Sequence, residues 1–223
     1  MSEATLMMSS DAGAERVRPA GTPAVLLFAR TFAEAHLYMD INPCECGESR
    51  FERDVEVLAQ RDGVLPIRFA GDCERCGALR EFTFQVPDRP GGPPAADSFS
   101  FPDDGPSGLI DPGQWWIAAR TYGGIADTVA GGVDPERAWR DPEAWEDMVS
   151  ILVNSAAAVD EALKFLPVGA SAMPAGAFWT ATGREVYQAV PDEFRRDILE
   201  RERAERWARL REFTDTHPDP DEL

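Results

Sequence analysis

The chain has 223 residues, which suits one large domain or two small ones. Apolar residues make up 43% of it, with six tryptophans and twelve phenylalanines, which is enough for a packed core and excludes a wholly disordered chain. The net charge is −18, from 40 acidic and 22 basic side chains. A field of that sign repels nucleic acids and anionic membranes and favours encounter with a basic partner.

The N-terminal region carries no sign of a targeting segment. No stretch reaches the ~20 apolar residues that cross a bilayer, and residues 1–20 lack a signal-peptide pattern. We therefore expect a cytoplasmic protein. Thiols stay reduced in that compartment, so paired cysteines are expected to be metal ligands rather than disulfides. Residues 1–22, rich in small and charged residues, are expected to form a flexible tail.

Residues 23–87 are expected to form a small antiparallel β domain. The capping-box spacing of Thr31 and Glu34 predicts a short helical turn. Residues 36–41 alternate strictly between polar and apolar, which predicts a half-buried strand. Further strands are expected over about 50–59, from about 64 to 71 and over 80–86, with an Asp62-Gly63 hairpin turn after the first of these.

A linker and a helical domain follow. Residues 88–106 are too rich in proline and glycine for a helix or central strand. Residues 107–216 should hold four or five helices, including long ones over about 142–166 and 191–213, where apolar residues recur at three- and four-residue steps. Asp-Pro pairs at 111, 134 and 141 have helix-start chemistry. Gly123-Gly124 and Gly131-Gly132 are expected to separate short helices, and residues 217–223 form an acidic tail. The predicted fold class is α+β.

The four cysteines occur in two tight clusters, Cys44-Glu45-Cys46-Gly47 and Cys73-Glu74-Arg75-Cys76-Gly77. Zinc takes four thiolates in a tetrahedron, and two turns that each offer two sulfurs supply them. The glycine that ends each cluster lets the backbone bend so that its N–H groups face sulfur. The sequence therefore predicts one structural metal site made by Cys44, Cys46, Cys73 and Cys76.

Residues 36–87 resemble the zinc-ribbon family, whose knuckles read Cys-x-x-Cys-Gly on two hairpins of a small sheet. The second cluster matches this pattern and the first is one residue shorter. The resemblance covers about 50 residues and implies a structural zinc ion without implying an activity. A Cys₄ iron centre and a redox-active dithiol stay open as alternatives. A closed Cys₄ site leaves no position for water or substrate, which argues against metal-assisted hydrolysis.

Other motifs carry less chemistry. The two histidines, His36 and His217, are not placed beside a nucleophile by any pattern, so no catalytic residues are assigned. Residues 91–164 hold thirteen acids and four basic residues, a net of −9. Six of the acids gather around a predicted helix start, and two tryptophans are adjacent in the same region. Together they form a candidate partner-binding surface, made of Trp115, Trp116, Asp134, Glu136, Asp141, Glu143, Glu146 and Asp147.

These features favour a non-enzymatic acidic module that binds a basic protein, with zinc as structural cofactor. An immunity or antitoxin-like inhibitor of a basic bacterial toxin and an adaptor subunit both fit this profile. One alternative is an enzyme with a carboxylate and arginine site at the junction between ribbon and helices. Another is a nucleic-acid-associated zinc ribbon; its candidate basic stripe is Arg195, Arg196, Arg201, Arg203, Arg206, Arg209 and Arg211.

Overall fold

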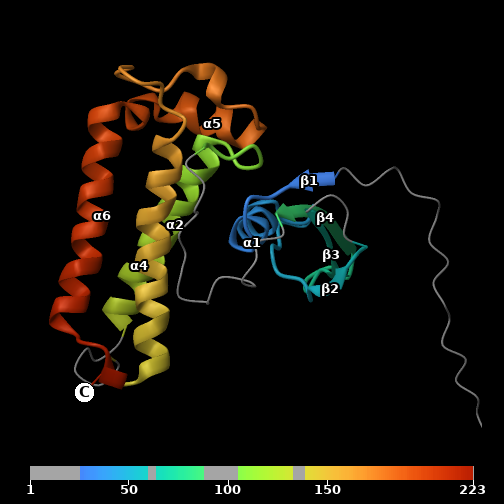
Figure 1. The fold of residues 1–223 in the computed structure, drawn as a ribbon, viewed down its shortest axis with the longest axis horizontal. Helices are drawn as coiled ribbons and strands as arrows, with labels where there is room; N and C mark the ends of the chain where they lie inside the picture. Colours follow the sequence, from blue (N-terminus) through green and yellow to red (C-terminus); the bar gives the residue numbers. More distant parts are fainter. Residues whose placement is uncertain (1–25, 60–63, 88–104, 133–138, 223) are drawn as a thin grey trace, which may run out of the picture.

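The fold is that of a computed structural model, which describes residues 26–59, 64–87, 105–132 and 139–222 (Figure 1). The expected tail over 1–22, the Asp62-Gly63 turn, most of the linker and the Asp134-Pro135 helix start lie outside these residues. The described part is an α+β arrangement, in which a four-stranded sheet precedes a group of packed helices. The predicted fold class is confirmed.

The sheet is mixed rather than purely antiparallel. Its strand order is β1 (Leu26–Phe28), β4 (Leu79–Pro87), β3 (Val64–Asp72) and β2 (Asp54–Val57). Strands β2, β3 and β4 form the expected antiparallel meander, whereas β1 pairs parallel to β4. The antiparallel expectation is therefore wrong at one edge. A three-residue strand is too short for its alternation to be visible in the sequence.

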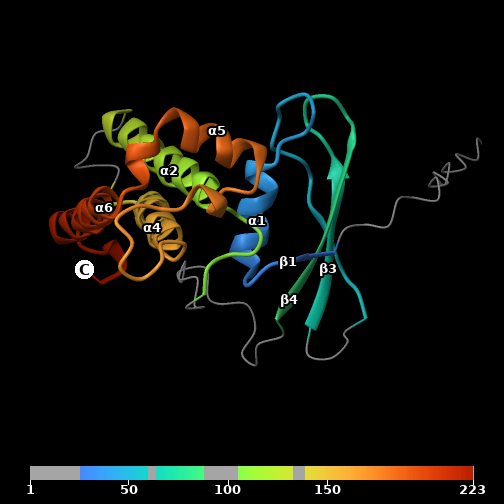
Figure 2. The same cartoon turned by 90° about the horizontal axis from the view of Figure 1, so that it is seen from above.

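Residues 36–41 form the second half of a helix, α1 (Phe32–Ile41), and not the predicted strand. Thr31 accepts a hydrogen bond from the Glu34 backbone N–H, so the expected helical turn is present and continues. Helix α1 lies between the sheet and the other helices (Figure 2). Because it is covered on two sides, it lacks the single apolar stripe that identifies a surface helix.

The remaining helices pack side by side. They are α2 (Pro112–Gly132), α4 (Pro142–Leu163), α5 (Ala181–Ala189) and α6 (Arg196–Thr216), with 3₁₀ turns η1 (Ala175–Ala177), η2 (Pro191–Phe194) and η3 (Pro220–Glu222). Helix α4 packs against both α2 and α6 (Figure 1). The helix predicted from residue 142 is confirmed. Both glycine pairs lie inside α2, so the prediction that they separate helices is wrong.

A buried carboxylate joins the starts of α2 and α5. Asp111 is completely buried; it accepts from the Gln114 backbone N–H and from both the N–H and the hydroxyl of Thr180. Gly183 lies against it so closely that a Cβ there would stand 2.1 Å from an Asp111 carboxylate oxygen. Helix α5 can therefore reach this position only with glycine at 183.

Apolar packing is continuous from the sheet to the helices. One cluster of buried side chains includes Ile67 and Phe84 of the sheet, Met39 of α1 and Trp115 of α2. A smaller cluster surrounds Trp139 at the other end of the helices. Helix α1 therefore joins the sheet to the helices through one core. Within the described residues, no helix has the length and apolar character that a membrane span requires.

Candidate metal centre

Four sulfurs meet where the sheet ends. The Sγ atoms of Cys44, Cys46, Cys73 and Cys76 lie within 4.8 Å of one another. The Cys44–Cys76 and Cys46–Cys73 sulfur pairs are each 3.6 Å apart. A tetrahedral metal with bonds of about 2.3 Å to sulfur separates its ligands by roughly 3.8 Å. The cluster can therefore hold one metal ion, as the cysteine spacing predicts.

Each pair of cysteines is carried by a tight turn that ends in glycine. The first turn follows α1, and Gly47 donates its N–H to the Cys44 carbonyl at 2.7 Å. The second turn joins β3 to β4, and Gly77 donates to the Cys73 carbonyl at 2.9 Å. Both glycines have positive φ, 84° and 69°, a conformation that other residues rarely adopt. Two separate parts of the chain thus present sulfur at one point.

Backbone N–H groups and neighbouring sulfurs in the turns also shift the pKa values of the cysteine thiols. Backbone N–H groups of Cys76 and Arg75 are directed at the Cys73 sulfur and lower the pKa of that thiol to about 7, against the opposing effect of desolvation. The Ala78 N–H acts in the same direction on Cys76, but the sulfurs of Cys46, Cys44 and Cys73 outweigh it and raise the Cys76 pKa to about 12. The Cys73 thiol therefore ionises readily, and the neighbouring sulfurs oppose ionisation of the Cys76 thiol. A bound cation removes that opposition because it neutralises the thiolates.

A buried arginine holds the two turns together. Arg80, at the start of β4, donates to the carbonyls of Met39 and Asn42 at the end of α1 and of Ser49 just after the first turn. Its guanidinium lies 4.5 Å from the Phe51 ring centroid. Sequence reasoning missed this residue. The available signal was its position in phase with Phe82, Phe84 and Val86, which places it on the covered face of the sheet.

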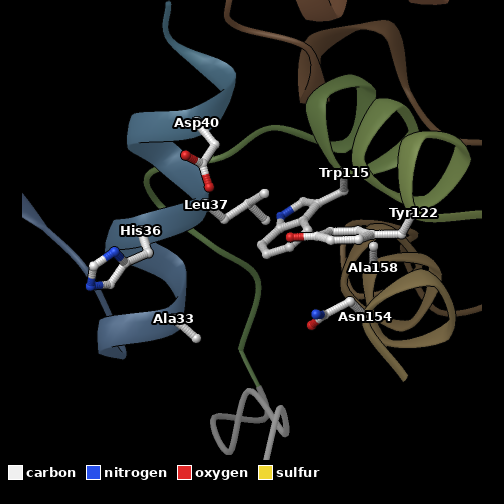
Figure 3. A pocket seen from close by; sticks show the side chains of 8 residues that line it. All are labelled: Ala33, His36, Leu37, Asp40, Trp115, Tyr122, Asn154 and Ala158. Carbon is white, nitrogen blue, oxygen red and sulfur yellow. The ribbon is translucent and has the colours of Figure 1, made fainter. Parts of the chain in front are cut away.

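A cleft lies between α1, α2 and α4 (Figure 3). It has two adjoining parts, of about 180 and 400 Å³, which share Leu37, Asp40 and Tyr122. Apolar side chains contribute much of its walls, and its titratable side chains are those of Asp40, His36 and Tyr122. The cleft occupies the junction between the sheet-bearing N-terminal part and the helices, where an enzyme site is one alternative predicted from the sequence.

The histidine of this cleft is paired with an arginine. Arg53 donates to His36 Nδ1 at 2.8 Å and also binds Asp40. Burial and the Arg53 charge lower the pKa of His36, partly opposed by Asp40. Since arginine only donates, Nδ1 carries no proton and His36 is a neutral imidazole. Among the described residues, nothing pairs this imidazole with a serine or cysteine nucleophile.

The candidate partner surface is only partly assembled. Trp115 is completely buried in the core, so it is not an exposed anchor. Trp116 is half-buried, with the Arg120 guanidinium 5.0 Å from its ring. Four acids are exposed on the first turns of α4, and two lie outside the described residues; the exposed four are Asp141, Glu143, Glu146 and Asp147, and the other two are Asp134 and Glu136.

The candidate basic stripe of α6 is interleaved with acids that pair with it. Arg206 binds Glu202 at 3.0 Å and Arg209 binds Asp127 at 2.8 Å. Ion pairs also join Arg195 to Asp197, Arg196 to Glu200, Arg201 to Glu205 and Arg203 to Asp160. These carboxylates neutralise the arginines locally, which weakens the attraction that a phosphate backbone would feel.

Comparison of the chain with protein-family models, with curated proteins and with solved structures gives no match.

Proposed function

We propose that the chain is a non-enzymatic binding module for a basic protein, stabilised by one structural zinc ion held as in a zinc ribbon. The observation that carries the zinc proposal is the closed set of four sulfurs within 4.8 Å. All four ligand positions come from cysteine, so a tetrahedral ion has none left for substrate. The ion would add to the contacts that already join the two turns, among them the hydrogen bond that Arg75 donates to the Cys46 carbonyl.

Four thiolates are a donor set that suits zinc, and the ribbon-like spacing of the cysteines is why we propose zinc before iron. Thiolate ligands favour zinc and iron over the hard cations. A redox-active dithiol fits less well because it needs only two cysteines, whereas all four sulfurs lie within 4.8 Å of one another. Direct metal analysis of protein purified without added metal distinguishes zinc from iron.

Replacing Cys73 or Cys76 with serine tests the metal centre. We expect the metal content to fall from one ion per chain to near zero, with a loss of about 4 kcal/mol or more in unfolding free energy, because loss of a structural metal is among the most damaging changes. Plasma mass spectrometry and urea unfolding measure the two effects. Glu45→Gln, between two ligands but not one of them, is the control. Unchanged metal content in both serine variants would refute the site.

Charge supports the binding part of the proposal. The chain carries a net −18, and Glu143, Glu146 and Asp147 are exposed together at the start of α4. Such a surface speeds encounter with a basic protein and sets its orientation. An inhibitor of a basic toxin and an adaptor subunit both need this property, and the identity of the partner separates them.

Affinity capture from the native host, at low and high salt, tests this binding. We expect one basic protein in stoichiometric amount, lost at high salt because screening removes charge attraction. The triple variant Glu143→Gln, Glu146→Gln and Asp147→Asn should lower its recovery. Glu212→Gln with Asp215→Asn, which removes acids from the end of α6, is the control. Recovery of nucleic acid, or of no specific protein, would contradict the proposal.

A second candidate function, an enzyme, is favoured by the cleft at the ribbon–helix junction. The cleft is lined by Asp40 and Tyr122, whose carboxylate and phenol can serve acid–base chemistry, and the imidazole of His36 points from α1 toward Phe69 of the sheet. Arg53 forms a direct ion pair with Asp40, which engages the carboxylate and weakens the case for an enzyme. A small molecule that displaces Arg53 and shifts the His36 proton resonances would favour this function.

A further inference from the structure

The sheet ends in an edge strand whose outer side has no partner among the described residues. Strand β2 pairs only with β3, at the register Asp54↔Ala70 to Val57↔Ile67. Leu58 donates its N–H to the Pro66 carbonyl at 2.9 Å, and Glu74 donates to the Arg50 carbonyl at 3.2 Å. Because antiparallel pairs alternate, the even-numbered residues bond to β3. The N–H and C=O groups of Val55 and Val57 therefore face outward.

The side chains beside this free edge are divided between two faces. Val55 and Val57 are on the α1-facing side of the sheet with Phe69 and Ile67, yet they remain 58% and 61% exposed. Helix α1 covers the central strands and leaves this edge open. An unpaired edge with exposed valines is a ready template for another strand.

The opposite face of the same edge is acidic. Glu52, Asp54 and Glu56 alternate with the residues of the first face, and all three are exposed. Arg68 pairs with Glu56 at 2.8 Å; Glu52 and Asp54 form no ion pair within the described parts of the chain. Acids that lie directly opposite on paired strands repel one another. The row therefore opposes pairing with β2 of a second copy and favours an incoming strand with basic side chains.

We propose that β2 binds an extended basic segment of a partner protein by strand addition, with the segment's apolar side chains on Val55 and Val57 and its basic side chains on Asp54 and Glu56. This inference rests on the proposed binding of a basic protein and adds where that protein docks. The edge is also tied to the metal centre, since Phe51 bridges Cys73. An ordered metal site thus fixes the start of the docking strand.

The test uses the full zinc-loaded chain and a fluorescent peptide of alternating arginine and valine. Valines paired opposite Val55 and Val57 direct their N–H groups at the edge, whereas the arginine N–H groups face away. We expect N-methylation of the valines to weaken binding by about tenfold or more, since it removes at least two hydrogen bonds. N-methylation of the arginines should change affinity by less than about threefold. Equal effects of the two modifications would overturn the proposal, because binding would then depend on charge alone.

Amide hydrogen exchange locates the contact. In the free chain the Val55 and Val57 amides should exchange fast and those of Glu56 and Leu58 slowly, and the unmodified peptide should slow the two valines. Valine amides that are slow before peptide is added would assign the edge to a second copy or to another segment of this chain, and overturn the proposal. If the peptide binds here but no basic protein is captured from the host, the proposed function fails and the edge site stands. If a basic protein is captured from the host but the peptide does not bind at β2, the proposed function stands and only the edge site is overturned.

Discussion

At the scale of single residues, the metal centre depends on more than its four ligands. Arg80 is 6% exposed and donates to three carbonyls of the segment that carries Cys44 and Cys46. It starts the strand that follows Cys76, so it fixes one turn relative to the other. Groups that orient ligands in this way tune metal affinity without touching the metal.

We therefore expect Arg80→Met to weaken metal binding by about 10- to 100-fold. Methionine keeps the apolar stem but leaves the three carbonyls without their donor. Competition with a chromophoric chelator measures the affinity. Arg50→Met removes an arginine of the same region that is 74% exposed, and should change the affinity little because exposed ion pairs contribute little. Equal affinities for all three proteins would show that Arg80 has no positioning role.

His36 predicts a pH dependence of stability. Burial and Arg53 hold its pKa below the ordinary value of 6.5, so the unfolded chain takes up a proton first as pH falls. The stabilisation from neutral His36 is thus complete above about pH 6.5 and is lost as pH falls toward the folded pKa, by at most about 1.4 kcal/mol per pH unit. Urea unfolding at pH 7.5 and 5.5 should show a smaller loss for His36→Gln than for the parent chain. An equal or larger loss would contradict this sign.

At the scale of elements, a buried charge network joins α1 to α4. Arg30 donates to Glu34 at 2.8 Å and to Glu161 at 2.7 Å, and Lys164 binds Glu161 at 2.6 Å. Arg30, Glu34 and Glu161 are at most 5% exposed. The two carboxylates raise the pKa of Arg30 against the opposing and larger single effect of burial. The network links the start of α1 to the end of α4.

Arg30→Met should destabilise the fold by about 3–5 kcal/mol, because it leaves two buried carboxylates without their shared cation. Chemical denaturation measures the loss. Arg201→Met is the matched control: its ion pair with Glu205 is 3.8 Å long and more than half exposed on both sides, so a change of less than about 0.5 kcal/mol is expected. A small effect of Arg30→Met would mean that water or other side chains compensate the carboxylates.

Elements whose apolar residues keep a clear helical period were predictable from the sequence, and α1, which lacks that period, was not. Helix α4 packs against both α2 and α6, yet its apolar residues still recur at three- and four-residue steps because its first turns expose a polar side. Helix α1 was mistaken for a strand because the sheet and the helices cover opposite sides of it. The cysteines were predictable because turn chemistry and ligand spacing are local. Arg80 and the Arg30 network depend on contacts between segments distant in the sequence, which no local pattern reports.

At the scale of the whole molecule, the shared core determines how the sheet and the helices unfold. The sequence predicts a ribbon domain over 23–87 and a helical domain over 107–216. The apolar cluster runs from Phe84 through Met39 to Trp115 without a break, and the Arg30 network crosses the same junction. Two units joined by a buried apolar interface unfold together when neither is stable alone.

We accordingly expect metal release and unfolding of the helices to occur at the same urea concentration. All six tryptophans follow residue 107, so their fluorescence reports the helices, while a metal-binding dye reports the cysteine turns of the sheet. Coincident transitions are the mark of one cooperative unit. Ile198→Val, a mild change to a half-buried residue of α6, should move both midpoints equally. Metal release at clearly lower urea, with tryptophan fluorescence unchanged, would instead make the sheet and its cysteine turns a unit that unfolds separately, despite the core it shares with the helices.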